Sequence, residues 1–212
     1  MYHPLFLAKA HESCKKHGIL FIADEIAVGF GRTGKFFAME HAGVSPDMMC
    51  LSKGITGGFL PLSVVLTTQE LYEAFYAPYG EMKGFLHSHS YTGNPLACAA
   101  ANAVLDLFEE SDVMALIAQK GEWLHDALTP IGALGCVKEI RQMGLIAAIE
   151  LQGFTFEERV GVKIFRHALS LGVLVRPLGN VVYMMPPYVI TKEEIAMMVD
   201  AVHESLKQVD HR

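Results

Sequence analysis

The sequence predicts an α/β protein in which a mostly parallel sheet is followed by a smaller α+β lobe. Short apolar runs at residues 19–23 and 47–51 each end in polar residues, and residues 36–43 between them are long enough for a crossover helix. This pattern is typical of two parallel strands joined by a helix. The carboxyl ends of such strands share one edge of the sheet, where ligands bind in open α/β folds.

The second part of the prediction comes from a change of pattern near residue 106. Helical patterns beyond that point lead into short strand patterns and then alternate with them. Helices segregated from a small antiparallel sheet are typical of an α+β lobe. We therefore expect two domains: residues 1–106 as the remainder of a large domain, and residues 107–212 as a small C-terminal domain.

Composition narrows the class of protein. The 212 residues are 51% hydrophobic, but charges interrupt each apolar run before it reaches membrane-spanning length. The N-terminus has no basic region followed by an apolar stretch, so no signal peptide is visible. A net charge of -6 without basic clusters argues against a nucleic-acid partner. We expect a soluble cytoplasmic protein.

The four cysteines give no disulfide or zinc pattern, because they are scattered and no Cys-x-x-Cys pair occurs. We expect all four to be buried free thiols of a reducing compartment. They are Cys14, Cys50, Cys98 and Cys136.

The elements of the first domain follow from turn and cap signals. A helix over residues 4–17 has proline in its first turn and can end at Gly18. The link 54–61 is too short for a crossover helix, so a strand at 62–66 should run antiparallel to the one before it. Helices are predicted at 69–76 and 94–108. A domain rarely begins with a helix that leads directly into a central strand, so we expect Met1 to be an internal methionine, with earlier strands missing.

The second domain is predicted to contain helices and short strands in succession. Its last helix is the best marked, because Thr191 can cap it and Glu194 completes a capping box. The expected helices lie at 113–128, 157–171 and 192–209, and the expected strands at 137–142, 145–151, 173–176 and 181–184.

Asp24 and Lys53 are the first candidates for chemistry, since each follows one of the two parallel strands. Desolvation at a strand end would lower the pKa of the Lys53 ammonium and yield the neutral amine that attacks a carbonyl. The alternative is a structural ion pair of Lys53 with Asp24 or Glu25. Glu25 should point to the opposite side from Asp24 and act structurally.

Two further motifs have competing interpretations. Gly29-Phe-Gly-Arg-Thr-Gly34 matches the GxGxxG pattern, but five residues separate it from the strand, and two acids would repel a pyrophosphate. A tight turn beside the site is the alternative. His87 and His89 could suggest a metal, yet no third ligand lies at a recognisable spacing, so we predict no metal. Small hydroxyl residues before the helix at Pro95 better suit an anion such as phosphate.

Arg176 precedes Pro177 at the end of a short predicted strand. It is either a surface charge or a clamp for a carboxylate, because its planar fork suits bidentate binding.

Taken together, these residues resemble those of class III aminotransferases, which are pyridoxal-phosphate enzymes of fold type I. The resemblance covers the chain nearly end to end and matches the later part of such enzymes. Within the class, the features of the biotin-pathway members that aminate 8-amino-7-oxononanoate to 7,8-diaminononanoate are the most similar. The matching stretches are Ile22-Ala-Asp-Glu-Ile-Ala-Val-Gly-Phe-Gly-Arg-Thr-Gly34, Leu51-Ser-Lys-Gly-Ile-Thr-Gly-Gly58, Tyr91-Thr-Gly-Asn-Pro-Leu-Ala-Cys98, Val175-Arg-Pro-Leu-Gly179 and Tyr183-Met-Met-Pro-Pro-Tyr188, with Ala27 as a further clue.

The resemblance implies roles for the cofactor-binding residues. Lys53 would form the Schiff base with pyridoxal 5'-phosphate and later carry a proton between the substrate carbon and the cofactor. Asp24 would pair with the pyridine nitrogen, and Ile26 would pack against one face of the ring. Ser90, where the family usually has threonine, would bind the cofactor phosphate of the neighbouring subunit, which implies a homodimer with shared active sites.

The resemblance also implies a substrate end. Arg176 would hold the carboxylate of the keto acid, and Ser88 would line the same end. The amino donor is S-adenosylmethionine in most such enzymes and lysine in some. The family's N-terminal half supplies the phosphate cup and the aromatic residue that stacks on the ring, so we expect weak cofactor binding and little turnover from these 212 residues alone. Another ω-amino-acid aminotransferase of the class, or a non-catalytic dimerising fragment, is the alternative.

Overall fold

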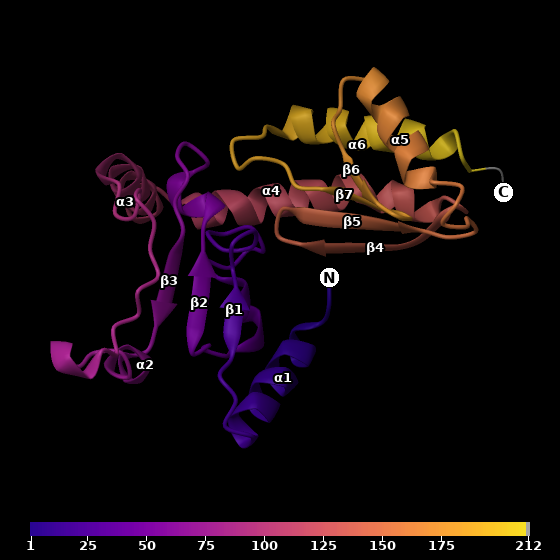
Figure 1. Ribbon diagram of the computed structural model, residues 1–212. Helices are drawn as coiled ribbons and strands as arrows, with labels where there is room; N and C mark the ends of the chain where they lie inside the picture. Colours follow the sequence, from indigo (N-terminus) through magenta and orange to yellow (C-terminus); the bar gives the residue numbers. More distant parts are fainter. Residues whose placement is uncertain (211–212) are drawn as a thin grey trace. The chain divides into compact units, whose positions relative to one another are not determined.

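The computed structural model describes residues 1–210 and divides them into two compact units (Figure 1). Unit 1 comprises residues 1–31 and 35–113, and unit 2 comprises residues 32–34 and 114–212. Three residues of the glycine-rich motif therefore belong to unit 2, although the residues on both sides of them belong to unit 1. Residues 106 and 107, at the expected domain boundary, lie inside a helix of unit 1.

Unit 1 is built on a three-stranded sheet in the order β1-β2-β3. Strands β1 and β2 are parallel, with Ile22 opposite Met48, and β3 returns antiparallel to β2, as the short link predicted. The elements are α1 (Pro4–Lys16), β1 (Ile22–Asp24), η1 (Ala38–Ala42), β2 (Met48–Leu51), η2 (Lys53–Thr56), β3 (Val64–Thr67), α2 (Gln69–Glu73), η3 (Tyr79–Glu81) and α3 (Pro95–Glu110).

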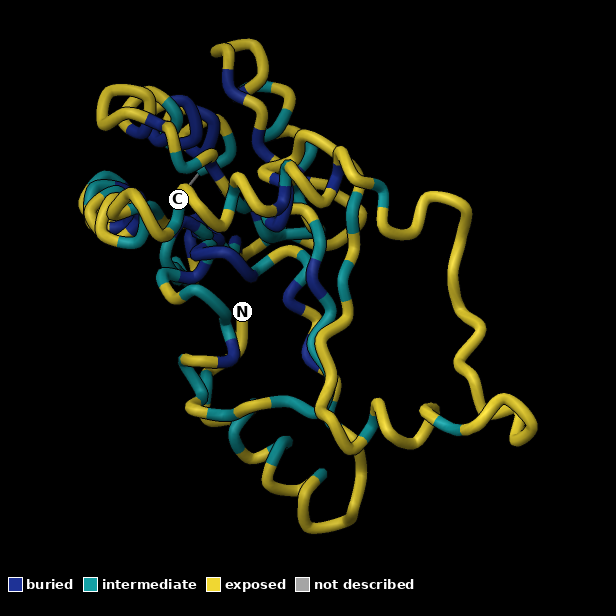
Figure 2. The backbone as a smooth tube through the Cα atoms, turned by 90° about the vertical axis from the view of Figure 1, so that its left-hand side faces the viewer, coloured by how far each residue is buried: buried dark blue, intermediate teal, exposed yellow. Residues whose placement is uncertain are grey.

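The core of unit 1 is small and rests on one aromatic cluster. Phe30 is buried together with Leu51, Ile55 and Ala101, and Phe36 packs edge-on against its ring. Long stretches of the remaining backbone are exposed, including the extended segment between α2 and α3 (Figures 1 and 2).

Unit 2 contains a four-stranded antiparallel sheet in the order β4-β5-β7-β6. Helix α5 packs against α6 and against strands β6 and β7. Its elements are α4 (Val113–Leu128), η4 (Thr129–Ala133), β4 (Val137–Met143), β5 (Ile146–Leu151), α5 (Val160–Ser170), β6 (Arg176–Leu178), β7 (Val181–Met184) and α6 (Lys192–Lys207). Helix α4 begins at the last residue of unit 1, and the rest of it belongs to unit 2.

The core of unit 2 consists mainly of aliphatic side chains from the sheet and its helices. Those with 0% or 1% exposure include Ile117, Leu124, Leu145, Ile149, Ile164, Val182, Ile195 and Leu206. The predicted capping box of α6 is present, since Thr191 accepts a hydrogen bond from Glu194 N–H and the Glu194 carboxylate accepts one from Thr191 N–H.

Several sequence predictions about the elements were wrong. Ile19 and Leu20 precede β1 and are more than half exposed, so their apolar character did not place them in the strand. The expected crossover helix at 36–43 is a five-residue 3₁₀ turn, η1, because Phe36 and Phe37 are taken up by the aromatic cluster. Strand β6 begins at Arg176, where the predicted strand 173–176 ends.

The cysteine prediction was only partly right. All four thiols are free, but only Cys136 is buried, and Cys98 is exposed. Burial, followed by the nearby Asp210 carboxylate, raises the pKa of the Cys136 thiol to about 11. This thiol therefore stays protonated and unreactive at neutral pH.

Candidate active site

The main candidate residues lie together at the carboxyl-terminal end of the unit 1 sheet, where β1 and β2 finish. Asp24 is the last residue of β1 and lies opposite Cys50, and Lys53 follows β2 after a single intervening residue, Ser52. Because the strands are parallel, both side chains start from the same edge. The expectation that Asp24 and Lys53 share one end of the sheet is thus met by the backbone.

Asp24 is exposed and fixes the turn that follows the strand. Its Oδ1 accepts a hydrogen bond from the backbone N–H of Ile26 at 3.0 Å. This bond holds the carboxylate beside the half-buried Ile26 and leaves Oδ2 without a hydrogen-bond partner among the described residues. Asp24 can therefore present one oxygen to a ligand while the other keeps the carboxylate oriented.

Glu25 has a structural role. Its side chain is 1% exposed, and its carboxylate accepts hydrogen bonds from the backbone N–H groups of Ala38 at 3.0 Å and Met39 at 2.9 Å. Both donors lie at the start of η1, where N–H groups have no partner within the turn. Glu25 is thereby separated from Asp24 by the alternation of the strand, as predicted.

Lys53 is exposed, which differs from the expectation of a desolvated amine. Among residues 1–210 it makes no ion pair, so the alternative of a structural salt bridge with Asp24 or Glu25 is not supported. Its backbone φ is 45°, in the left-handed region that a non-glycine residue seldom adopts. Ser52 supports this conformation, because its hydroxyl donates to Leu62 O at 2.7 Å. Unfavourable backbone conformations of this kind cluster at functional sites.

The glycine-rich motif forms a turn beside the aromatic cluster. Phe30 is buried with φ 58°, and Gly31 and Gly34 also have positive φ. A dinucleotide site would need a helix that opens on the last glycine, whereas the next element is the 3₁₀ turn η1. The structure favours the tight-turn interpretation.

Ser88 and Ser90 lie in the exposed segment before α3. The N-terminal N–H groups of α3 are already used, because Asn94 Oδ1 accepts from Leu96 N–H at 2.9 Å and Ala97 N–H at 3.4 Å. An anion at this segment would thus be bound mainly by hydroxyl groups. Within residues 1–210, no hydrogen bond or ion pair joins Ser88 or Ser90 to Asp24 or Lys53.

Arg176 belongs to unit 2, where it starts β6 opposite Tyr183 of β7. Its side chain is exposed and makes no ion pair within the described part of the chain. The guanidinium is therefore available for a carboxylate.

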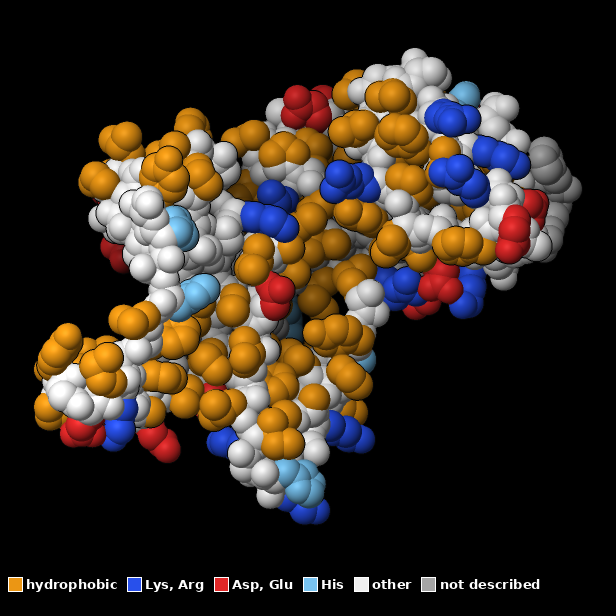
Figure 3. All heavy atoms as spheres, viewed as in Figure 1, with side chains coloured by type: hydrophobic (Ala, Val, Ile, Leu, Met, Phe, Trp, Pro, Cys, Tyr) orange, Lys and Arg blue, Asp and Glu red, His pale blue; other side chains and the backbone are white. Residues whose placement is uncertain are grey.

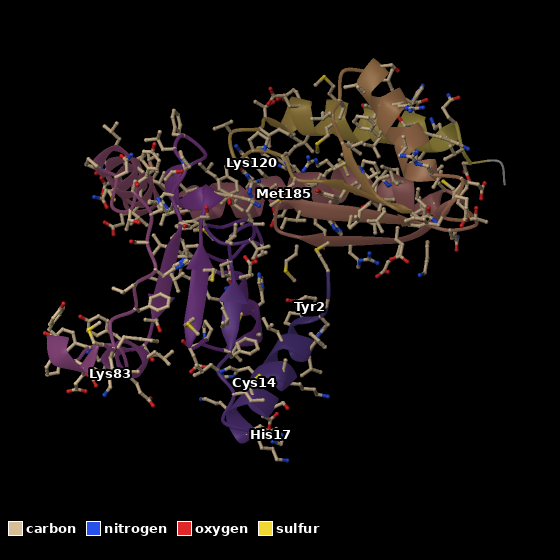
Figure 4. All side chains as sticks on the ribbon, viewed as in Figure 1. Tyr2, Cys14, His17, Lys83, Lys120 and Met185 are labelled. Carbon is tan, nitrogen blue, oxygen red and sulfur yellow. The ribbon has the colours of Figure 1, made fainter. Side chains whose placement is uncertain are left out.

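The sequence analysis missed two cations that hold the segment after β7. Arg32 donates to Pro186 O, and its guanidinium lies 4.4 Å from the centre of the Tyr188 ring. Lys120 of α4, labelled in Figure 4, donates to Tyr188 O at 2.5 Å. Burial raises the pKa of the Tyr188 hydroxyl, with Arg32 acting in the opposite direction. The one sequence signal for these contacts is Arg32 itself, a basic residue inside the glycine-rich motif.

The structure adds no metal chemistry to this set. Within residues 1–210, no group of three or more His, Cys, Asp or Glu side chains is arranged to hold a metal ion. In the same range, no helix is both long enough and apolar enough to cross a membrane.

The residues at the edge of the unit 1 sheet fit pyridoxal phosphate. A carboxylate, a primary amine and an aliphatic side chain are the groups that a protonated pyridine nitrogen, an aldehyde and a ring face require. These groups come from Asp24, Lys53 and Ile26, at the ends of two adjacent strands. The Glu25 carboxylate is engaged by backbone N–H groups and does not take the place of Asp24.

Comparison with known proteins identifies the family of the chain. The model of the family "Aminotransferase class-III" matches residues 1–206. The adenosylmethionine-8-amino-7-oxononanoate aminotransferase of Geobacter sulfurreducens is 48% identical over 211 residues, which are 96% of this chain and 47% of the relative. The solved structure of the same-named enzyme of Methanocaldococcus jannaschii has a TM-score of 0.90 at 37% identity and covers 96% of this chain and 49% of that one.

A PLP-bound amine transaminase from an uncultivated Pseudomonas species is also similar, with a TM-score of 0.87 at 36% identity, covering 97% of this chain and 48% of that one. The chain thus spans about half the length of the curated relatives that it matches.

Proposed function

The chain belongs to the class III aminotransferases, and from this premise we propose that it is part of an enzyme that aminates 8-amino-7-oxononanoate to 7,8-diaminononanoate in biotin synthesis with pyridoxal 5'-phosphate. The observation that supports this most directly is the placement of Asp24 and Lys53 at the carboxyl ends of two paired parallel strands. The substrate is proposed from relatives up to 48% identical, which are named adenosylmethionine-8-amino-7-oxononanoate aminotransferases.

Bound pyridoxal phosphate supplies an electron sink that stabilises the carbanion formed at the substrate carbon. Asp24 would face the pyridine nitrogen and keep it protonated, and its exposed carboxylate is already oriented by Ile26 N–H. Lys53 would supply the primary amine that holds the cofactor at its aldehyde group, and the same amine would then move a proton at the substrate carbon. Ile26 packs against one face of the ring.

Arg176 binds the carboxylate of the keto acid through its guanidinium fork, and Ser88 lines the same end of the substrate. Ser90 of one subunit binds the cofactor phosphate of its partner, so the working form is a homodimer with shared active sites. The amino donor is S-adenosylmethionine or lysine, and the location is the cytoplasm.

Borohydride reduction followed by peptide mass mapping tests the role of Lys53. We expect the phosphopyridoxyl label on Lys53 after incubation with pyridoxal phosphate, and we expect visible absorbance that is absent in Lys53→Ala. Lys35→Ala, another exposed lysine of unit 1, is the matched control. Label on other lysines in equal amount, or a protein that stays colourless with added cofactor, would contradict the proposal.

A second measurement addresses the substrate, because amine transaminases have the same fold with similar TM-scores. Addition of 7,8-diaminononanoate should bleach the cofactor band in a single turnover, and β-alanine should not. The reverse preference would favour another ω-amino-acid aminotransferase of the class. Bleaching by neither compound would favour a non-catalytic fragment.

A further inference from the structure

Unit 2 has an open groove between the end of α5 and the outer side of α6. The two helices pack against each other (Figure 1). The apolar lining of the groove comes from Leu171, which follows α5, and from Ala196 and Met197 of α6. The groove has a volume of about 570 Å³, and within it Met197 is 55% exposed and Leu171 is 44% exposed. We call this feature the α6 groove.

The core of unit 2 does not account for the apolar side chains of the α6 groove. The buried side of α6 carries Ile195, Val199, Val202 and Leu206, at the spacing of one helix face. Met197 lies outside that face and is exposed. Exposed apolar side chains that gather in a groove, in contrast to those scattered singly, mark an interaction site.

The α6 groove is bordered by negative charge. Glu193, Asp200 and Glu204 line it, and among the described residues that line it none is basic. Figure 3 shows acidic and hydrophobic side chains next to one another over the first turns of α6. Glu204 is paired with Lys207 at 2.7 Å, whereas Glu193 and Asp200 make no hydrogen bond or ion pair within residues 1–210. Two unpaired carboxylates therefore lie one turn before and one turn after Met197 on the same side of the helix.

This combination selects the class of occupant. Negative charge repels nucleic acids and anionic lipid surfaces and attracts lysine and arginine side chains. The lining residues of α6 extend from residue 193 to residue 204, which is roughly 16 Å along the helix and suits a polypeptide segment. The main-chain groups of both helices are used within the helices, so an extended peptide would find no backbone partners, whereas a helix satisfies its own.

We propose that the α6 groove binds a basic amphipathic helix of a partner protein. An apolar side chain of that helix packs against Leu171 and Met197, and lysine or arginine side chains to either side of it pair with Glu193 and Asp200. Methionine suits such a surface because its unbranched side chain adapts to the shape of the partner. This inference goes beyond the proposed reaction and does not depend on it, since none of the residues assigned to cofactor or substrate lines the groove.

The test measures binding of a synthetic peptide to the 212-residue chain by fluorescence anisotropy. The probe is a labelled helix of alanine, leucine and lysine, about 18 residues or five turns long, with leucines in one stripe and lysines along its borders. We expect saturable binding that weakens at high salt, because the paired charges are exposed. A peptide of the same composition in scrambled order should bind roughly tenfold more weakly, since its leucines and lysines no longer share one face. A peptide with glutamate in place of lysine should not bind.

Two pairs of variants locate the surface. Asp200→Lys should weaken binding by roughly tenfold or more, whereas Asp126→Lys, with the same change of charge at an exposed position of α4, should bind as the parent does. Met197→Ala should weaken binding by roughly three- to tenfold, and Leu116→Ala, at a position of α4 that is 50% exposed, should have little effect. Circular dichroism checks that the variants keep the parent fold.

Methyl NMR of the parent chain gives a measurement that needs no variant. The methyl resonance of Met197 should shift when the peptide is added, and that of Met184, which is 2% exposed, should not.

Five results would overturn the proposal. They are equal binding of the ordered and scrambled peptides, equal binding by the parent and Asp200→Lys, an unchanged Met197 resonance, binding of spermidine as tightly as the peptide, and self-association of the chain that covers Met197. Cofactor and substrate are absent from these measurements, so their outcome is separate from that of the labelling and bleaching experiments.

Discussion

Asp24 and Glu25 are neighbours of the same charge, and the strand gives them opposite roles. Asp24 is exposed at the sheet edge with one oxygen engaged, whereas Glu25 is buried and accepts two backbone N–H groups. A carboxylate that satisfies buried donors contributes to stability, and one that is held ready at the surface contributes to binding. These two consequences can be separated by mutation.

We predict that Glu25→Gln lowers the free energy of unfolding by roughly 1–3 kcal/mol, because the amide nitrogen cannot accept from Ala38 or Met39 N–H and leaves a buried donor unsatisfied. Asp24→Asn should leave stability within about 0.5 kcal/mol, since the side chain is exposed. Urea unfolding followed by circular dichroism measures both. Equal stability losses in the two variants would contradict the assigned roles.

Gly144 is a residue at which two backbone segments of unit 2 approach closely. A Cβ built on it would lie 2.5 Å from Gly34 N and 2.5 Å from Thr33 C, and its φ is +56°. We predict that Gly144→Ala destabilises unit 2 by roughly 2–5 kcal/mol, from left-handed strain and overpacking together.

Gly172→Ala is the matched control for this prediction. Gly172 also has positive φ, at +87°, but a Cβ there would meet nothing within 4 Å. The Gly172→Ala variant should therefore be destabilised only by the left-handed backbone strain, which is roughly 1–2 kcal/mol. Thermal unfolding of both variants compares them directly, and a Gly172→Ala variant as unstable as Gly144→Ala would show that the close approach is unimportant.

At the scale of elements, local signals predicted those elements whose ends are marked by the chain itself. The sequence placed α4 at residues 113–128 and β7 at 181–184 with the bounds that the structure has, and the capping box gave the start of α6. The antiparallel return of β3 followed from the length of the link before it. In these cases the turn or cap depends on residues within a few positions, which a single sequence contains.

The errors arose where contacts distant in sequence decide the conformation. Ile19 and Leu20 have the apolar character of strand residues but no strand partner among the described residues, so periodicity alone misplaced the start of β1. The aromatic cluster around Phe30 and Phe36 left only a 3₁₀ turn between β1 and β2. The same limit applies to the site. The sequence placed Asp24 and Lys53 at the same end of the sheet, but the exposure of Lys53 and its positive φ depend on packing, which the sequence pattern does not reveal.

The hairpin of β4 and β5 carries an ion-pair network that should make stability depend on pH. Lys138 Nζ and Arg141 Nη1 each lie 2.5 Å from a Glu150 carboxylate oxygen, and these two hydrogen bonds, that of Lys138 first, lower the Glu150 pKa from 4.5 to about 2. A lowered pKa in the folded state means that the stabilisation is complete above the unfolded pKa of 4.5. It is lost as the pH falls from there toward 2.

We therefore predict that the parent chain loses more stability than Glu150→Gln between about pH 5 and pH 3, with the gap reduced at high salt because these charges are partly exposed. Urea unfolding across this pH range measures the two slopes. Parallel curves for parent and variant would show that the network does not contribute.

On the scale of the whole molecule, the two units differ in how much apolar surface each buries. The fully buried aliphatic side chains come mainly from unit 2, whereas unit 1 relies on a small aromatic cluster and exposes apolar residues along β1 and in the segment before α3. The proposed residues are divided between them, with Asp24 and Lys53 in unit 1 and Arg176 in unit 2. The positions of Asp24 and Lys53 therefore depend on unit 1, which has the smaller core.

We predict that unit 1 opens at lower free energy than unit 2 in the isolated chain. Hydrophobic burial is the main stabilising contribution, so strands β1–β3 should exchange their amide hydrogens faster than β4–β7 and α4–α6. Hydrogen-exchange mass spectrometry of the 212-residue chain measures this difference peptide by peptide. Equal exchange in both units of the free chain would mean that they unfold as one cooperative body, and that the exposed apolar residues of unit 1 do not weaken it.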